Sequence, residues 1–440
     1  MQIRSMLNWA MRRNQVKYFI RRAANEGSGV SDEIRLSRFN AVWKDAYENV
    51  PFYEEWKVKH SLPDAIASLK DLSSWPVLEK RDIILNANKF IRAGYKGPYH
   101  ESVTGGSTGE PLHFRVWPQA SDEVTSSLWM GWARWGVYPD SRIFLLWGHR
   151  HFYGNGWRRK IKIAIKYVRD TVTNKCRADA TDLSVSSLEK IVKRMLAFRP
   201  EAVIAYSASL LALCRSLPQY SERCRALKLK AVICTAGPLT AKERAFMSEY
   251  FGCPVAMEYG SMEGGMIAYM SPALNGRYGV FESTHFIHTL PEVGSDNQQV
   301  LVTKIYPCYL PLIRYRIGDY IKGVSLDAHG MVTSFDEVYG RIGDEVDMGN
   351  GIRFHGQTFM VCAEGFDQII AYQIRVDKAK GHVTFVAQSI SPLTADEKCE
   401  IKRRAAHMSG LQIKDISIEE SSNLAKAPSG KIRLVVFENE

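Results

Sequence analysis

The sequence predicts an α/β protein with a large N-terminal domain, residues 1–339, and a small α+β C-terminal domain, residues 340–440. Three observations predict this division. Apolar strand-like segments alternate with helix-like segments over residues 186–259, which favours parallel βαβ units. Residues 280–337 change to short segments of alternating hydrophobicity, which are typical of an antiparallel or barrel-like subdomain. A chain of 440 residues also exceeds the size at which a single core keeps growing.

Composition indicates a globular protein of a reducing compartment. Hydrophobic residues make up 45% of the chain and charged residues 24%, both ordinary for a globular domain. The eight cysteines are scattered without a Cys-x-x-Cys pair, which argues against a disulfide framework and against a zinc site. No apolar stretch approaches the ~20 residues that span a bilayer. We expect a cytoplasmic protein with no nucleic-acid partner, and the sequence leaves the oligomeric state open.

Positive charge is concentrated in two segments, residues 1–25 and 157–169, in a chain of formal net charge +11. Two interpretations stay open. The basic residues form solvated helix faces, or a field that attracts anionic ligands. Alternatively, they dock the protein reversibly on an anionic membrane surface, at the inner face of the membrane.

The elements of the N-terminal domain follow from the spacing of apolar residues and from turn residues. Residues 35–57 have the pattern of a folded segment. Ser186 and Glu189 form a capping-box pattern for a helix that Pro200 ends. The expected order that follows is strand 202–206, helix 208–217, strand 231–235, helix 241–251 and strand 255–259.

Chemically useful residues follow the ends of these strands. Ser207, Ala236-Gly237 and residues 260–263 each fall at the end of a predicted parallel strand. Because ligands of parallel sheets bind beyond the carboxyl ends of the strands, we expect a binding site there.

The C-terminal part begins after two further predicted strands, 300–303 and 312–315. Gly340, Gly343, Gly349 and Gly351 crowd a stretch with the composition of a hinge. Beyond it the pattern predicts strands 372–376 and 383–386, helix 394–408 and a glycine-containing tail.

The most informative segment is Ser102–Pro111, in which three glycines are interleaved with hydroxyl side chains. Glycine permits positive φ and close approach of the main chain, so the N–H groups of such a loop can surround an anion. Glu110-Pro111 replaces the Lys-Ser/Thr ending of a P-loop, which excludes that class of nucleotide site. A polyphosphate loop and a plain surface turn remain the two alternatives.

This segment resembles the phosphate-binding signature of the adenylate-forming enzymes, and four further segments resemble the other signatures of that superfamily in the same order. Those four are Glu258–Gly264, Arg314–Asp319, Gly340–Asp344 and Pro428–Arg433. Segments Asn49–Tyr53, Trp75–Lys80 and Pro311–Arg316 are similar to the phenylacetate–CoA ligase branch, and within it to members associated with capsular polysaccharide biosynthesis.

The resemblance implies a role for each matching residue. Glu263 would bind Mg²⁺ and Lys431, on a mobile loop, would bridge the carboxylate and the α-phosphate. The residues implied for ATP are Thr104, Gly105, Gly106, Ser107, Thr108, Gly109, Gly237, Tyr259, Gly260, Asp319 and Arg341. The residues implied for the acid substrate are His149, Tyr206, Ser207 and Ser261.

Three positions depart from the pattern of the superfamily. Met262 stands where a threonine hydroxyl usually meets a phosphate. Residues 236–239 lack the glutamate of the usual Gly-Glu-Pro, and Gly343 stands where many relatives carry a charged side chain.

The resemblance therefore implies ATP-dependent activation of a small-molecule carboxylic acid, with transfer to coenzyme A and release of AMP and pyrophosphate. A lid, residues 340–440, would rotate between the two half-reactions. Three alternatives remain: acyl transfer to an amine or hydroxyl during surface polysaccharide assembly, nucleotidyl transfer as in the deazaflavin-adenylating relatives, and non-catalytic nucleotide binding.

Overall fold

The computed structural model divides the chain into two compact units, each built from separate segments. The first contains Met1–Thr104, Glu110–Asp140 and Ala256–Tyr339, and the second contains Gly105–Gly109, Ser141–Val255 and Gly340–Glu440. The structure describes residues 17, 19–20, 23, 30–104, 112–147, 165, 168–180, 182–235, 237–292, 296–341, 345–348, 352–355, 359–363, 365–366, 368–425 and 432–438.

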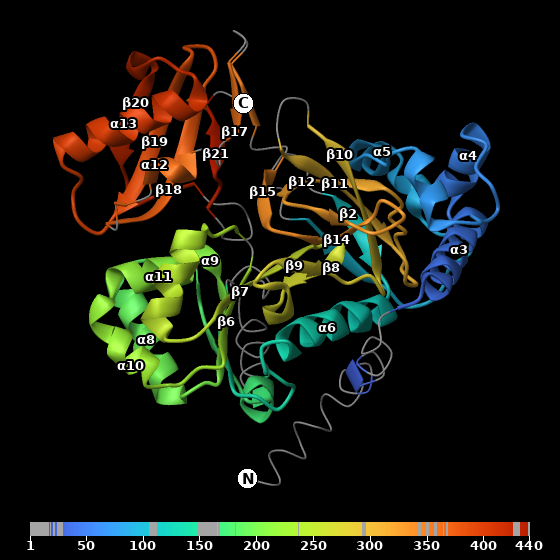
Figure 1. The fold of residues 1–440 in the computed structure, drawn as a ribbon, viewed down its shortest axis with the longest axis horizontal. Coiled ribbons are helices and arrows are strands. Elements are labelled where there is room, and N and C mark those ends of the chain that lie inside the picture. The colour runs from blue at the N-terminus through green and yellow to red at the C-terminus, as the bar shows by residue number, and fades with distance from the viewer. Residues whose placement is uncertain are drawn as a thin grey trace. The chain divides into compact units, whose positions relative to one another are not determined.

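The first unit begins with helices and a hairpin (Figure 1). Ser31 caps the first long helix by accepting a hydrogen bond from the Ile34 amide, and Pro51 opens the next helix, where no amide donor is needed. The elements are α3 (Asp32–Asn49), α4 (Pro51–Lys59), α5 (Lys80–Leu85), β1 (His100–Val103), β2 (His113–Val116) and α6 (Pro118–Ala133).

Two sets of antiparallel strands complete this unit, which confirms the β-rich subdomain expected over residues 280–337. One runs in the order β7 (Val255–Ser261), β8 (Gly265–Met270), β9 (Tyr278–Val280), β14 (Val332–Phe335) and β13 (Ser325–Leu326). The other runs β10 (His285–Pro291), β11 (Gln298–Lys304), β12 (Tyr315–Lys322) and β15 (Glu337–Arg341).

One predicted strand in this region is wrong. The strand expected over residues 312–315 begins only at Tyr315. Arg314 has a φ of 48°, in the left-handed region that no strand residue adopts, and the preceding Leu312 and Ile313 are buried outside any strand. The apolar residues of this segment therefore indicated burial in the core and did not indicate a strand.

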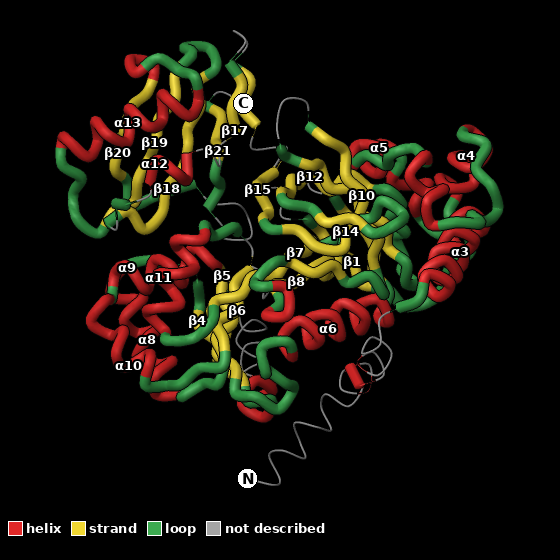
Figure 2. The backbone as a smooth tube through the Cα atoms, viewed as in Figure 1, coloured by secondary structure: helices red, strands yellow, loops and turns green. Residues whose placement is uncertain are grey.

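The second unit contains the predicted parallel sheet, in the order β4 (Lys175–Ala178), β3 (Ile143–Leu146), β5 (Ala202–Tyr206) and β6 (Ala231–Thr235). Figure 2 shows its helices gathered beside these strands. They are α8 (Val185–Phe198), α9 (Ser207–Ser216), α10 (Ser221–Arg225) and α11 (Ala241–Phe251).

The start of α8 corrects a second expectation. Ser184 occupies the N-cap, without a side-chain cap bond, so Ser186 lies inside the helix rather than at a capping box. Asp182 accepts from the Ser184 amide at 3.0 Å and from the Ser187 hydroxyl at 2.5 Å, and these bonds fix the entry. Glu189 instead accepts from the Tyr220 hydroxyl at 2.8 Å.

The C-terminal residues of the second unit form the expected α+β arrangement around their own core, which includes Val376, Phe385 and Ile401. The strand order is β20 (Ile416–Glu420), β19 (His382–Ser389), β18 (Ile369–Asp377) and β21 (Val435–Phe437), with α12 (Met360–Ala363), α13 (Ala395–Ser409) and the hairpin β16 (Glu345–Asp347)–β17 (Arg353–His355). The division into domains at residue 340, with a mobile lid, stays a prediction.

Among the described residues, no helix is both long and apolar enough to cross a membrane. Most of the basic segments 1–25 and 157–169 lie outside the described residues, so their docking on a membrane stays a prediction.

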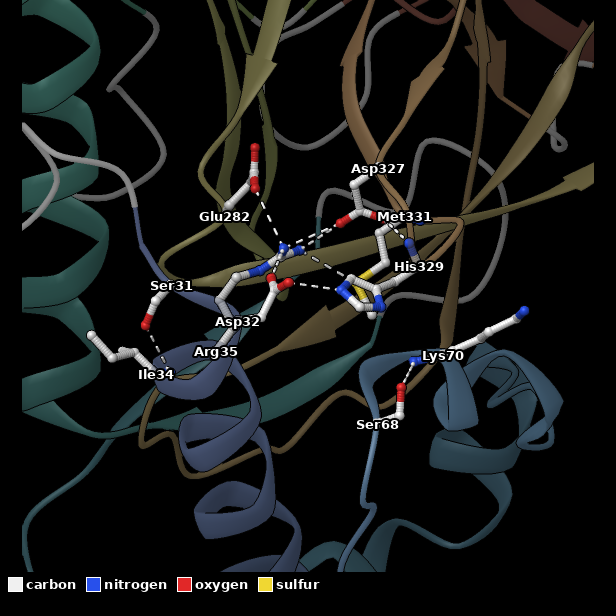
Figure 3. A network of polar contacts seen from close by, with 10 residues as sticks. All are labelled: Ser31, Asp32, Ile34, Arg35, Ser68, Lys70, Glu282, Asp327, His329 and Met331. Atoms are coloured by element: carbon white, nitrogen blue, oxygen red, sulfur yellow. Dashed lines mark hydrogen bonds and ion pairs between the residues drawn. The ribbon is translucent and has the colours of Figure 1, made fainter.

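The buried side chain of Arg35 connects helix α3 to the turn that contains Asp327, in the β-rich part of the first unit. The Arg35 guanidinium is 4% exposed and donates to Asp327 at 3.1 and 3.2 Å and to Asp32 at 3.0 Å, with Glu282 at 3.6 Å (Figure 3). A hydrogen bond from His329 is the main reason that the pKa of Asp32 lies below its usual value. Burial raises the pKa of Glu282. Removing Arg35 would take away the cation that faces the partly buried Asp327, while Asp32, which is 57% exposed, would keep its contact with His329.

A second buried ionisable side chain, that of His288, is not held by hydrogen bonds to the described residues as Arg35 is. His288 of β10 is 4% exposed, and neither of its ring nitrogens has a hydrogen-bond partner among the described residues. Burial, and to a smaller extent the charge of Arg314, lowers its pKa from 6.5 to about 4. The folded protein therefore holds a neutral imidazole where the unfolded chain would bind a proton.

The stability of the first unit should consequently fall as the pH falls from about 6.5 to about 4. His288→Phe should remove this contribution, because the unfolded variant gains no proton at that position. Between pH 6.5 and 5 wild type should lose about 1.6 kcal/mol relative to His288→Phe, because the slope rises from half of 1.36 kcal/mol per pH unit at pH 6.5 toward the full value below it. Urea unfolding at the two pH values measures this difference. The exposed His100→Phe should behave like wild type, and parallel pH profiles for His288→Phe and wild type would contradict the assignment.

Candidate active site

A tight turn between β7 and β8 is the centre of the candidate site. At Gly260 a Cβ atom would lie 2.3 Å from the carbonyl oxygen of Gly265, and Gly265 itself has a φ of 77°. Within the turn the Ser261 hydroxyl accepts from the Gly264 amide at 2.8 Å. Only glycine satisfies both backbone requirements, so the sequence Gly-Ser-Met-Glu-Gly-Gly specifies this turn.

Glu263 lies within this turn, and hydrogen bonds hold both its backbone and its carboxylate. Its carbonyl oxygen accepts from the ammonium of Lys304 at 3.0 Å, and its Oε1 accepts from the Tyr315 hydroxyl at 3.4 Å. His285 Nε2 lies 2.9 Å from the Gly264 carbonyl, which requires the proton to be on Nε2. The glutamate is 9% exposed, so its carboxylate is oriented by protein contacts rather than by bulk water.

Tyr259 and Asp319, predicted separately to bind ATP, lie together. The Tyr259 hydroxyl donates to Asp319 Oδ2 at 3.0 Å, although the residues are 60 positions apart. Gly318, with a φ of 88°, permits the backbone conformation that precedes this aspartate in β12. The Tyr259 ring packs edge-on against Phe335, 5.8 Å between centroids, and is 6% exposed.

Beside the turn is a pocket with both charged and apolar walls. Its charged side chains are Arg115 of β2, Glu263 and Lys304, and Met262 contributes an exposed thioether. The remaining lining residues are Phe114, Val116, Ala120, Val124, Gly265, Tyr306, Cys308, Tyr309 and Leu310.

The hairpin β1–β2 carries the glycine-rich segment between its strands. Thr104 lies at the first end, where its amide donates to the Leu112 carbonyl at 3.0 Å and its Oγ1 accepts from the Leu112 amide at 2.9 Å. Gly105, Gly106, Ser107, Thr108 and Gly109 lie outside the described residues. The hairpin thus fixes the two ends of the loop by main-chain geometry.

In the second unit, two of the four residues expected for the acid substrate, Tyr206 and Ser207, lie at the end of β5. The Ser207 hydroxyl has the carbonyls of Thr235 and Gly237 within 3.1 and 2.7 Å, so its proton serves one of them at a time. The Tyr206 ring lies 4.6 Å from that of Trp147, and burial raises the pKa of Tyr206 to about 12. This phenol is therefore a neutral donor at physiological pH.

Other predicted site residues cannot be placed. His149 and Lys431 lie outside the described residues, and Arg341 is described only as the last backbone position of β15. Their roles stay predictions.

The first unit could accommodate a magnesium ion that also binds phosphate oxygens. Among the described residues no group of three or more acidic, histidine or cysteine side chains forms a metal site. Mg²⁺, however, is usually held by one or two carboxylates together with substrate phosphates and waters. The single carboxylate of Glu263 fits that arrangement.

Sequence reasoning missed two residues that hold the turn, Lys304 and His285. Neither lies in a recognisable motif, because each contacts a main-chain carbonyl, which every type of residue possesses. Their only signal is a charged or polar residue at the end of an apolar strand, as in Val-Leu-Val-Thr-Lys.

No family model matches the chain. Protein CapK from Staphylococcus aureus is 24% identical over 296 residues, which cover 66% of this chain and 62% of CapK, less than two thirds of that protein.

Solved structures of similar fold include two CoA ligases. A 2-hydroxyisobutyryl-CoA ligase in the postadenylation state, in complex with R3-HIB-AMP, has a TM-score of 0.70 at 14% identity, covering 93% of this chain and 90% of the ligase. The anthranilate CoA ligase AuaEII, in complex with anthranoyl-AMP, has a TM-score of 0.51 at 14% identity, covering 76% of this chain and 66% of AuaEII.

These likenesses confirm the predicted fold class: the chain has the fold of the adenylate-forming ligases. The similarity to Protein CapK supports the capsule-associated resemblance that the motifs predict.

Proposed function

We propose that this protein activates a small carboxylic acid with ATP and then transfers the acyl group to coenzyme A. A carboxylate oxygen attacks the α-phosphorus of ATP, and the bond to the bridging oxygen breaks. Its electron pair leaves with pyrophosphate, and an acyl-adenylate remains. The coenzyme A thiol, losing its proton, then attacks the acyl carbon and AMP departs.

One observation carries the proposal: two separate sequence motifs meet in one place. The Tyr259 hydroxyl donates to the buried Asp319 carboxylate, and Glu263 follows four residues after Tyr259 in the turn held by Lys304 and Tyr315. An ionised aspartate can accept from the ribose hydroxyls, and an aromatic ring can pack against adenine. A carboxylate beside them can hold Mg²⁺ on the phosphates.

The remaining roles follow the resemblance. The glycine-rich segment 104–109 would hold the β- and γ-phosphates, and Lys431 would neutralise charge between carboxylate and α-phosphate during adenylation. Arg341, at the proposed hinge, would approach the ribose or the α-phosphate. The proposed lid would exchange the adenylating arrangement for a thioester-forming one.

The acceptor has one supported alternative. The motifs resemble a branch whose members are associated with capsular polysaccharide biosynthesis, and the similarity to Protein CapK favours that branch. In such an enzyme an amine or a sugar hydroxyl would take the acyl group. The activation step is the same in both cases, so only the second half-reaction differs.

A pyrophosphate-release screen over aryl, aliphatic and hydroxy acids, each with and without coenzyme A, tests the proposal. Release that depends on one class of acid identifies the substrate. Consumption of the free thiol in parallel identifies coenzyme A as acceptor. A protein that binds Mg·ATP and releases no pyrophosphate with any acid would be a non-catalytic nucleotide binder.

Asp319→Asn should weaken ATP binding about tenfold or more, because a charged hydrogen-bond partner of the ribose is lost. The amide keeps the shape of the carboxylate and an oxygen for the Tyr259 hydroxyl, so the local fold should persist. Calorimetry with Mg·ATP measures the change. The matched variant Asp336→Asn, on a half-exposed side chain paired with Arg277, should bind as wild type does. Unchanged affinity in Asp319→Asn would contradict the ribose role.

Lys431→Ala should abolish acid-dependent pyrophosphate release while thioester formation from a supplied acyl-adenylate survives. The reason is that the lysine acts only in the adenylating arrangement of the lid. Single-turnover assays of the two half-reactions separate these effects, and Lys414→Ala, an exposed lysine of the C-terminal part, is the control. Loss of both half-reactions in a folded variant would refute the assignment.

A further inference from the structure

Strand β18, which lies between β19 and β21 (Figure 1), carries a fully buried glutamine. Gln373 is 0% exposed, while its strand neighbours Ile374 and Val376 belong to the apolar core of the C-terminal residues. Because side chains alternate along a strand, Gln373 lies on the opposite face of the sheet from Ile374. A buried amide costs free energy unless its donors and its acceptor are satisfied. A glutamine at this position therefore needs a specific set of partners.

The partners of the Gln373 amide are main-chain groups of the tail that follows β20. Its Nε2 donates to the carbonyl of Ala425 at 3.1 Å and to that of Arg433 at 2.8 Å. Its Oε1 accepts from the Ala425 amide at 3.2 Å. The Arg433 amide in turn donates to the Ala425 carbonyl at 3.0 Å. One side chain thus joins two tail positions that also bond to each other, and all of its hydrogen-bonding groups serve this junction.

Further main-chain bonds fix the tail to the sheet on both sides of the junction. Before it, the Ser421 amide donates to the Ala387 carbonyl of β19 at 2.8 Å. After it, the Ile374 amide donates to the Leu434 carbonyl at 2.7 Å. The chain that enters residues 426–431 and the chain that leaves them are therefore both attached to the same sheet.

The segment between these attached ends contains Lys431, which the proposed function assigns to adenylation. Residues 426–431 themselves lie outside the described residues. Lys431 comes two positions before Arg433, so covalent geometry keeps their Cα atoms within about 7 Å of each other. Fixing Arg433 therefore limits where the backbone of residue 431 can lie. A group that must reach two reacting atoms depends steeply on such a limit, because small misplacements cost large factors in rate.

We propose that Gln373 is a positioning residue for adenylation. Its amide fixes Ala425 and Arg433, and through them the position from which the Lys431 ammonium reaches the carboxylate and the α-phosphate. The inference rests on the proposed function and adds to it a residue that touches no ligand. Thioester formation, which does not use Lys431 in that function, does not depend on Gln373.

Gln373→Met tests the inference, because it keeps an unbranched side chain of similar length and removes all three hydrogen bonds. The rate of acid-dependent pyrophosphate release should fall about tenfold to a hundredfold. Mg·ATP affinity by calorimetry and thioester formation from a supplied acyl-adenylate should stay close to wild type. Hydrogen exchange at the Ala425 amide, which loses the Gln373 acceptor, should become faster.

Two further variants separate positioning from a general loss of stability. Gln373→Glu keeps an acceptor and, since burial favours a protonated carboxyl, one donor. Its adenylation rate should lie between those of wild type and Gln373→Met. Ile374→Val weakens the core on the other face of the same strand and leaves the amide in place. It should therefore keep the wild-type ratio of the two half-reaction rates.

The comparison with Lys431→Ala distinguishes failure of the inference from failure of the proposed function. A folded Gln373→Met that adenylates at the wild-type rate, or that loses both half-reactions in parallel, would overturn the inference while the proposed function stands. If Gln373→Met does not fold, Gln373→Glu decides by the same two criteria. Wild type that releases no pyrophosphate with any acid, or Lys431→Ala that adenylates normally, would overturn the proposed function and the inference together.

Discussion

The close approach of β7 and β8 at two glycines is the constraint from which the candidate site follows. Any side chain at Gly260 would overlap the carbonyl of Gly265, and Gly265 needs a left-handed backbone. With both glycines present the chain reverses in three residues, so Glu263 lies at the tip with Tyr259 four residues before it. The strand therefore supplies an aromatic ring from its interior, and the turn that follows it supplies a carboxylate.

So tight a reversal leaves main-chain carbonyls inside the protein, and these need donors. The Lys304 ammonium and the His285 ring supply them, while the Ser261 hydroxyl accepts from the Gly264 amide. Each of these groups costs desolvation energy that an apolar residue would not. The polar residues buried around the turn thus exist because of the backbone geometry, and they place positive charge beside Glu263 as a consequence.

The sequence predicted the parallel part of the fold well because its signals are local. Helix α11 and strands β5 and β6 have the predicted bounds, since periodicity and turn residues define them without tertiary contacts. Predictions failed in one place where tertiary packing decides and in another where a nearby side chain offers a different local contact. The apolar run at Leu312 is buried outside a strand because Arg314 turns the backbone, and Ser186 is not a cap because Asp182 organises the helix entry. In the site, motifs located Tyr259, Glu263 and Asp319, whereas Lys304 and His285 act through carbonyls and leave no motif.

The geometry of the turn does not depend on the side chain of Met262, although residue 262 belongs to a motif. The hydrogen bonds that hold the turn use the side chains of residues 261, 285 and 304 and the main chain of residues 263 and 264. None uses the side chain of residue 262, which is 58% exposed. Replacing a hydroxyl there by a thioether therefore leaves Glu263 in place, and the substitution changes only what the pocket offers a ligand. A departure at this position is consequently weak evidence for an inactive protein, because the carboxylates at 263 and 319 keep their partners whichever side chain stands between them.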